Sequence, residues 1–324
     1  MNKKENSFKK YILLYVKGLG VGAADSVPGI SGGTIAFISG IYEELINSLR
    51  SLTPKNFILF FTGKIKAFWE EINGSFLLVL VLGVATGLIL FAKFILGMLD
   101  KYPVAMWSFF FGLILISTFS VLRTIEKTTK YTFIAFGVGA VLAYLITVMG
   151  VAQTNNELWF IFVCGAVAIC AMILPGISGA FILLLMGKYQ YMLSALNSFK
   201  IDIIAVFAGG AIIGLLSFSH FLSWLLRKYH DVTVALLAGF MFGALNKVWP
   251  WKVQTNPATN EKWQWSMDRF TDHSVKLVES NHLPQTFEQL TKVDANLKIG
   301  LISAAAAIVI FMTIEAIGGA KKNK

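Results

Sequence analysis

Two copies of one five-residue sequence, Pro-Gly-Ile-Ser-Gly, have the residue types and spacing that suit anion chemistry. They occupy residues 28–32 and 175–179. Proline lacks a backbone donor and glycine permits unusual dihedral angles, so each copy predicts a break in a helix. Serine is a favoured N-cap where the next helix begins. Each copy therefore predicts a helix N-terminus whose free N–H groups and partial positive charge suit an anion.

Both copies belong to a longer internal repeat. Residues 24–51 and 171–198 are identical at 11 of 28 positions when one is moved by 147 residues. The similarity continues downstream at a shift of 127 residues, because the second half has no counterpart of residues 54–72. At this shift, Gly83, Gly87, Phe91 and Phe94 match Gly210, Gly214, Phe218 and Phe221.

The composition is that of a polytopic membrane protein. The 324 residues are 56% hydrophobic and 14% charged, with a mean hydropathy of +0.68, and several apolar stretches are long enough to span a bilayer. In a soluble protein a net charge of +10 would suggest nucleic acid. In a membrane protein, basic residues instead mark cytoplasmic loops, so we expect no nucleic-acid partner. Cys164 and Cys170 share one apolar segment and are expected to pack there without a disulfide.

These features predict an all-α polytopic integral membrane protein with two repeats, residues 1–150 and 151–324. Each repeat is expected to combine a re-entrant helical hairpin with three transmembrane helices. Three spans separate the hairpins, so the hairpins would enter from opposite faces as an inverted repeat, with both termini cytoplasmic. The first repeat comprises a hairpin at 11–50, an interfacial helix at 54–72 and spans at 76–99, 104–122 and 131–150. The second comprises a hairpin at 158–197, spans at 201–226, 232–249 and 298–317, and an extracytoplasmic loop at 250–297.

Ionisable residues within or beside apolar segments are further candidates, because burying a charge in a membrane is costly and usually functional. Lys93 and His220 occupy matched places in the two repeats. Asp25 precedes the first break, where the second copy has Met172, and Lys188 follows the second motif.

A nucleophilic interpretation of the first motif is an alternative. Residues 29–33 fit the pattern Gly-x-Ser-x-Gly, but that motif needs a strand before the serine, and the second copy has Ala180 at its last position. An intramembrane protease would use Ser31 or Ser178 as nucleophile and His220 as base. Because two near-equal copies in opposite orientation do not suit one nucleophile, we expect no enzyme.

The paired motif also carries a family resemblance. The sequence ADSVPGISGGT, followed later by LPGISG, resembles the PopT-like undecaprenyl phosphate translocases, bacterial membrane proteins formerly classed as a domain of unknown function. The resemblance covers nearly the whole chain. It implies that a polyprenyl phosphate lipid moves from the outer to the inner leaflet of the cytoplasmic membrane for carrier recycling, without a cofactor. A secondary transporter of a small anion or other solute is the alternative.

A lipid phosphate would then bind between the two breaks near mid-membrane. Donors would come from the first hairpin (Ser31, Gly32, Gly33 and Thr34) and from the second (Ser178 and Gly179). Lys93 or Lys188 would add a cation, and His220 or Asp25 could link binding to protonation. The breaks themselves would be made by Pro28, Gly29, Pro175 and Gly176. The competing interpretation is that the motif only packs the two hairpins together.

Overall fold

The computed structural model describes residues 2–26, 31–150, 152, 154–266 and 277–319. These ranges hold 15 helices and three short strands. Four of the described helices are long and apolar enough to cross a membrane, and each coincides with a predicted span. The all-α polytopic membrane class is therefore confirmed. The four helices are α6 (Gly74–Lys101), α7 (Pro103–Leu122), α8 (Lys130–Val148) and α12 (Ile201–Lys228).

Contacts divide the chain into two compact units. Unit 1 comprises Met1–Ala92 and Val121–Gly243, and unit 2 comprises Lys93–Ser120 and Ala244–Lys324. Each unit therefore contains segments of both sequence repeats. The division at residue 150 describes the sequence repeat, whereas the compact units follow tertiary packing.

Both predicted hairpins lie in unit 1, and the outgoing arm of each is broken a second time. The arms bend at Gly40 and Gly187, whose φ values of +70° and +66° lie in the left-handed region that favours glycine. The apolar pattern alone predicts continuous arms at residues 34–50 and 177–197. The first hairpin consists of α1 (Asn2–Asp25), α2 (Gly32–Ile38) and α3 (Tyr42–Arg50), and the second of α9 (Leu158–Ile173), α10 (Gly179–Leu185) and α11 (Tyr189–Asn197).

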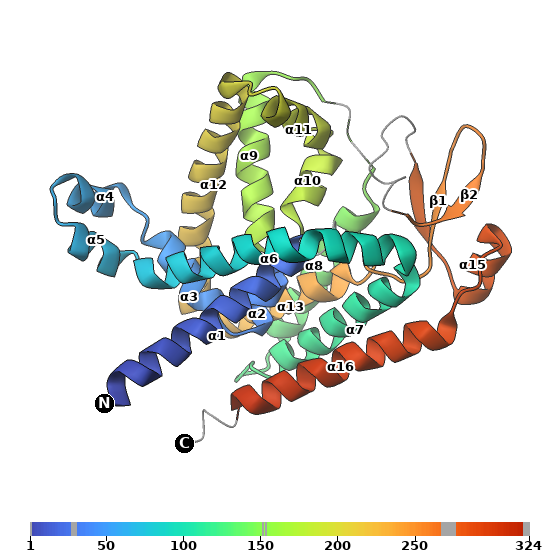
Figure 1. Ribbon diagram of the computed structural model, residues 1–324, viewed down its shortest axis with the longest axis horizontal. Helices are drawn as coiled ribbons and strands as arrows, with labels where there is room; N and C mark the ends of the chain where they lie inside the picture. The colour runs from blue at the N-terminus through green and yellow to red at the C-terminus, as the bar shows by residue number, and fades with distance from the viewer. Residues whose placement is uncertain (1, 27–30, 151, 153, 267–276, 320–324) are drawn as a thin grey trace. The chain divides into compact units, whose positions relative to one another are not determined.

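The sequence repeat is also a packing repeat within unit 1 (Figure 1). A β-carbon at Gly83 of α6 would lie 2.5 Å from the carbonyl oxygen of Tyr15 on α1. In the second repeat, a β-carbon at Gly210 of α12 would collide with the carbonyl oxygen of Phe162 on α9. Tyr15 and Phe162 are repeat partners, as are the two glycines. Small residues allow each hairpin to pack closely on its long helix.

The later helices of the two repeats are exchanged between the units. In unit 1, α8 packs on α13 (His230–Ala244), where a β-carbon at Gly239 would collide with the carbonyl oxygen of Phe136. In unit 2, α7 packs on α16 (Leu297–Gly319), where a β-carbon at Gly112 would lie 2.5 Å from the carbonyl oxygen of Ala304. Each of these pairs joins a helix of the first repeat to a helix of the second.

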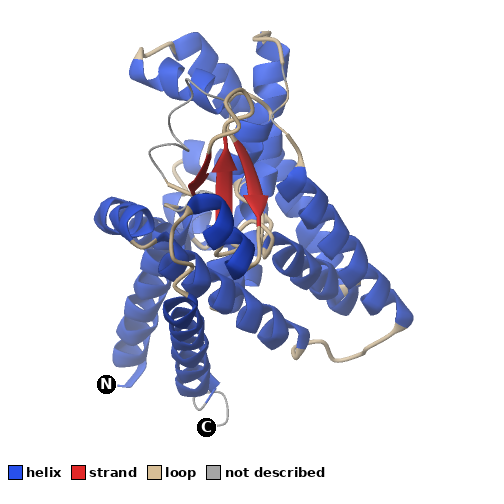
Figure 2. Ribbon diagram, turned by 90° about the vertical axis from the view of Figure 1, so that its right-hand side faces the viewer, coloured by secondary structure: helices blue, strands red, loops and turns tan. Residues whose placement is uncertain are grey.

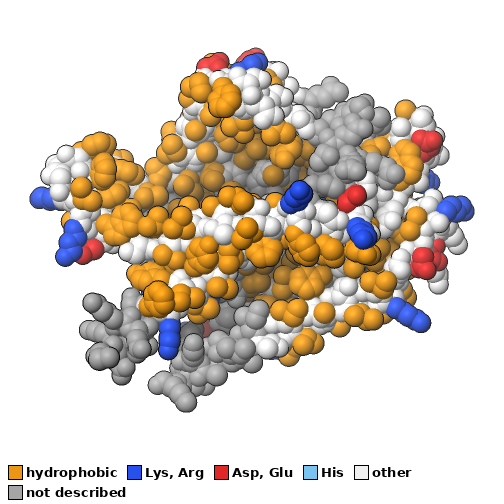
Figure 3. Space-filling model, viewed as in Figure 1, with side chains coloured by type: hydrophobic (Ala, Val, Ile, Leu, Met, Phe, Trp, Pro, Cys, Tyr) orange, Lys and Arg blue, Asp and Glu red, His pale blue; other side chains and the backbone are white. Residues whose placement is uncertain are grey.

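Two short helices, α4 (Pro54–Phe61) and α5 (Ile65–Glu71), project from the rest of unit 1 (Figure 1). No residue of α4 is buried, and the Phe61 side chain is 82% exposed. Hydrophobic side chains cover this arm, and basic side chains lie near its end (Figure 3). This surface is the one that the predicted interfacial helix requires, because its apolar side chains would enter the headgroup region.

Unit 2 contains a small sheet in the segment 250–297, which the sequence predicts to be a loop. Strand β1 (Lys252–Thr255) lies between β2 (Lys262–Gln264) and β3 (Val278–Asn281), and both pairings are antiparallel (Figure 2). In the register, Val253 lies opposite Gln264 on one side and Ser280 on the other.

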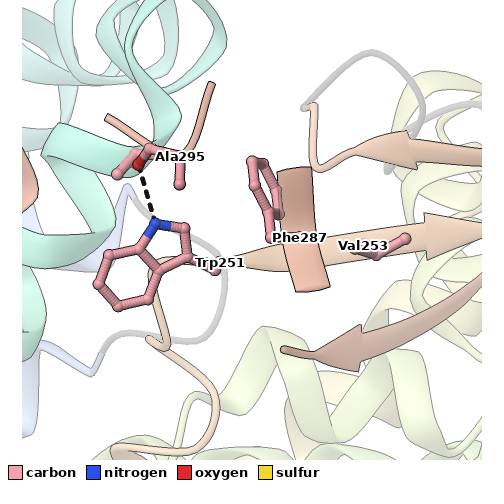
Figure 4. Close-up of a cluster of buried hydrophobic side chains, with 5 residues drawn as sticks. Trp251, Val253, Phe287 and Ala295 are labelled. Atoms are coloured by element: carbon pink, nitrogen blue, oxygen red, sulfur yellow. Dashed lines mark hydrogen bonds between the residues drawn. The ribbon is translucent and has the colours of Figure 1, made fainter. Parts of the chain in front are cut away.

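One face of β1 packs on a small apolar core (Figure 4). Helix α15 (Pro284–Thr291) contributes Phe287, which packs with Val253 and Trp251. The indole Nε1 of Trp251 donates a hydrogen bond of 2.9 Å to the carbonyl oxygen of Ala295. The predicted loop is therefore a folded cap, and its buried core also includes Val104 of α7.

Candidate functional site

Unit 1 brings the start of α2 against the second break, which follows the end of α9. The hydroxyl oxygen of Thr34 accepts a hydrogen bond of 2.8 Å from the backbone N–H of Gly176. The hydroxyl of Tyr42 donates to the carbonyl oxygen of Ile173 at 3.1 Å. Both side chains are buried. Side chains of the first hairpin thus satisfy backbone groups that the second break frees, which a membrane interior requires.

Ser31 is the N-cap of α2, as its position in the motif predicts. Its Oγ accepts a hydrogen bond of 3.1 Å from the backbone N–H of Gly33 and donates to the carbonyl oxygen of Leu174 at 3.3 Å. A β-carbon at Gly33 would lie 2.8 Å from the carbonyl oxygen of Ile173. Glycine is therefore needed at this position, because the two hairpins meet there through backbone.

The N-terminus of α2 already holds an internal anion. The Asp25 carboxylate accepts a hydrogen bond of 2.6 Å from the backbone N–H of Gly32, and a β-carbon at Gly32 would overlap that carboxylate. At the other end of α2, the Nζ of Lys17 donates to the carbonyl oxygen of Ser39 at 2.6 Å. An acidic group at the N-terminus and a basic group at the C-terminus both complement the helix dipole.

The N-terminus of α10 has no comparable group. Met172 occupies the repeat position of Asp25, and the Ser178 side chain makes no capping hydrogen bond. The first N–H groups of a helix have no acceptor within the helix, and at α10 no capping side chain supplies one. Of the two helix N-termini predicted to bind an anion, α2 is thus occupied by Asp25, whereas α10 has no capping side chain.

Two of the predicted ionisable residues have hydrogen-bond partners of their own. Lys188 is only 2% exposed, and its Nζ donates to Asn156 Oδ1 at 2.7 Å and to the carbonyl oxygen of Thr154 at 3.1 Å. It follows the C-terminus of α10, so about 10 Å of helix separates it from Ser178. His220 is exposed, with its Nδ1 2.7 Å from the carbonyl oxygen of Leu216 on its own helix.

The remaining predicted residues are placed as follows. Lys93 is exposed on α6 and belongs to unit 2. Pro175 is buried at the second break. Pro28 and Gly29 lie outside the described residues.

The contributions of Tyr42 and Lys17 to this site are not predicted by the sequence. Tyr42 matches Tyr189 in the repeat, which marks the position but gives it no role. Lys17 contacts the C-terminus of α2 only because α1 folds back along it, and no local pattern encodes that contact.

The arrangement offers hydrogen-bond donors in apolar surroundings rather than an activated nucleophile. The Ser31 hydroxyl is engaged with Leu174 and Gly33, and the His220 ring is hydrogen-bonded within its own helix. Among the described residues, no three His, Cys, Asp or Glu side chains gather as metal ligands. The geometry therefore favours binding of an anion and gives the protease interpretation no support.

Comparison with known proteins points in the same direction. Residues 21–265 match a family model described as undecaprenyl phosphate translocase-like. The chain is 43% identical over 305 residues to a polyprenyl-phosphate transporter of Vibrio cholerae serotype O1 (strain ATCC 39315 / El Tor Inaba N16961), and the match covers 94% of this chain and 96% of that protein. It is 28% identical over 253 residues to a protein of the same name from Staphylococcus aureus (strain NCTC 8325 / PS 47), covering 72% and 85%. No solved structure matches.

Proposed function

The chain belongs to the undecaprenyl phosphate translocase-like family, and on this premise we propose that it moves a polyprenyl phosphate between the leaflets of a bacterial cytoplasmic membrane. The family match over residues 21–265 carries this proposal, because that range includes both motifs, the whole second hairpin and the first hairpin from the end of α1 onward. The proposed direction is from the outer to the inner leaflet, which returns the lipid carrier for reuse.

The proposed mechanism shelters only the phosphate headgroup, because the polyprenyl tail can remain in lipid. The proposed phosphate-binding seat is the N-terminus of α10, which has no capping side chain. Its donors would come from Ser178, Gly179 and Ala180. Asp25 supports this assignment, since its carboxylate on the Gly32 N–H is the same kind of anion contact at the repeat-related helix. A phosphate at α10 would occupy the place that Asp25 occupies at α2.

The other motif residues have a positioning role in this proposal. Ser31 and Thr34 hydrogen-bond to backbone groups of the second break and so hold the residues immediately before α10. Lys188 donates hydrogen bonds to Thr154 and Asn156 and so fixes the connection between α8 and α9. His220 is hydrogen-bonded to Leu216 on its own helix, and Lys93 belongs to unit 2, so neither is assigned to this seat.

The membrane arrangement is part of the same proposal. Both termini are proposed to face the cytoplasm, and the two hairpins to enter from opposite faces. The support is the distribution of basic residues, which gather in the segments assigned to the cytoplasm. Such an arrangement would let one conformational change exchange access between the two leaflets.

Reconstitution tests the function directly. The purified protein in liposomes should accelerate the appearance of labelled undecaprenyl phosphate in the opposite leaflet, as detected by a membrane-impermeant reagent that reacts with the headgroup. The matched substrate control is the corresponding polyprenol, which has the same tail without phosphate. No acceleration over empty liposomes would contradict translocation, and equal acceleration of the polyprenol would contradict recognition of the phosphate.

A further inference from the structure

The face of β1 opposite the apolar core of unit 2 carries a buried lysine. Side chains alternate along a strand, so Lys252 and Gln254 point away from the core that contains Val253. Lys252 is only 2% exposed. A lysine in such a position normally has an acceptor or a carboxylate partner, because an unpaired buried ammonium is costly.

Two tryptophans form the walls around this ammonium. Its Nζ lies 3.4 Å from the ring centroid of Trp107, on α7, and 5.9 Å from that of Trp265. The two indole rings pack edge to face with centroids 5.1 Å apart. Neither the Nζ of Lys252 nor the Nε1 of Trp107 has a hydrogen-bond acceptor in the described part of the protein. The ring faces attract the cation but accept none of its hydrogen bonds in the normal geometry.

The nearby carboxylate is already committed to other donors. Glu279 accepts a hydrogen bond of 2.7 Å from Lys247 Nζ and one of 2.9 Å from Trp265 Nε1. Among the described residues, Glu279 is therefore hydrogen-bonded to Lys247 and not to Lys252. Burial lowers the pKa of Lys252 well below its usual value, an effect that Glu279 opposes and Lys247 reinforces.

We propose that Lys252 and Trp107 form a seat for a phosphate group in unit 2, separate from the breaks in unit 1. Both groups offer only donors, an ammonium and an indole N–H, so the chemistry that completes them is a compact anion with several acceptor oxygens. A polyprenyl phosphate headgroup and free inorganic phosphate share this chemistry. The lipid assignment rests on the proposed function, whereas the anion seat itself does not. A phosphate reaches this seat only when the groups that cover Lys252 move.

Ligand-dependent thermal unfolding of the intact purified protein tests the seat. Farnesyl phosphate, inorganic phosphate and farnesol would be titrated separately in phosphate-free detergent buffer. Farnesyl phosphate should raise the Tm and farnesol should not. Lys252→Met should weaken farnesyl phosphate binding at least tenfold, about 1.4 kcal/mol. Trp107→Phe, which keeps a ring and removes the N–H, should weaken it several-fold. The control is Lys262→Met on neighbouring β2, where the side chain is only partly buried, and it should bind as the parent does.

The outcomes separate the seat from the alternatives. Parent-like affinity for phosphate ligands in both Lys252→Met and Trp107→Phe would overturn the proposal and leave a purely structural cation–π pair. Lys252-dependent binding of inorganic phosphate without farnesyl phosphate would support the seat and assign it to free phosphate. Liposome translocation is scored separately: a parent that binds through Lys252 but moves no lipid would refute the proposed function and leave the seat standing. If Lys252→Met fails to fold, Trp107→Phe alone decides the test.

Discussion

The hydroxyl oxygen of Thr34 lies 2.8 Å from the backbone nitrogen of Gly176, and this hydrogen bond joins two motifs through residues that are 142 positions apart in the chain. It pairs a side chain of the first hairpin with a backbone donor of the second break. The first hairpin therefore stabilises the backbone of the second break.

Thr34→Val should remove this acceptor while nearly preserving the shape of the side chain. The partly buried N–H of Gly176 would be left unpaired, which costs up to about 1–3 kcal/mol of unfolding free energy. Thr34→Ser keeps the hydroxyl and should cost less. Chemical unfolding of both purified variants in detergent measures the difference, and equal stability of the valine variant and the parent would contradict the role of this bond.

Gly33→Ala should separate the hairpins and impair translocation. The new β-carbon would lie 2.8 Å from the carbonyl oxygen of Ile173, a backbone atom that cannot rotate away. Gly20→Ala is the matched control, because its β-carbon would meet only Ile35 Cγ2 at an ordinary 3.5 Å. Liposome translocation should fall at least tenfold for the first variant and remain near the parent value for the second. Similar rates for both would show that the close approach is dispensable.

Met172→Asp should block the proposed phosphate seat on α10 with a carboxylate of the protein itself. Met172 is the repeat partner of Asp25, and a β-carbon placed on Gly179 would lie 3.2 Å from its Cβ. A carboxylate there would compete with phosphate for the N-terminus of α10, as Asp25 does at α2. In a Lys252→Met background, which removes the proposed unit 2 seat, polyprenyl phosphate binding should fall strongly, whereas Met172→Leu in the same background should leave it unchanged. Normal binding by the aspartate variant would show that the phosphate does not bind at the N-terminus of α10.

The membrane arrangement can be tested by thiol labelling. Single cysteines at positions 53, 126, 155 and 260, in a background without Cys164 and Cys170, would be exposed to an impermeant reagent in intact cells. Positions 155 and 260 should react, and positions 53 and 126 should react only after permeabilisation. Labelling of 53 or 126 in intact cells, or none at 155 and 260, would contradict the inverted repeat.

The stability of the protein should rise with pH because of Lys252. Burial makes its folded pKa lower than that of the unfolded chain, which is about 10.4. Between those two pKa values the unfolded chain binds more protons, so the free energy of unfolding increases as the pH rises. Chemical unfolding across a pH series of about 7 to 9.5, below the unfolded pKa, should show this slope in phosphate-free buffer, and Lys252→Met should flatten it. An unchanged slope in the variant would assign the effect to another group.

The long apolar helices could be predicted from sequence because their signal is local. A run such as α6, with 28 residues and one charged residue in its first 26, spans a membrane regardless of its neighbours. The repeat also predicted which glycines would pack, since Gly83 and Gly210 meet repeat-related partners.

The details of the site could not be predicted because they depend on contacts between distant segments. The motif predicted two helix N-termini, but only the fold brings Asp25 onto one of them and leaves the other without a capping side chain. The strands of the cap are 3–4 residues long, too short to give a period-two pattern. Lys252 lay in an expected polar loop, and its burial follows from Trp107, which is far away in sequence.

The exchange of helices between the repeats constrains how the chain is made. When α7 leaves the ribosome, its unit 2 partner α16 is still to be synthesised, and α8 must likewise wait for α13. A chain cut after the first repeat would leave both α7 and α8 without the neighbours that their glycines contact. The two repeats, although each has its own hairpin and long helix, are therefore not independent folding units, and α7 gains its unit 2 partner only when α16 is inserted.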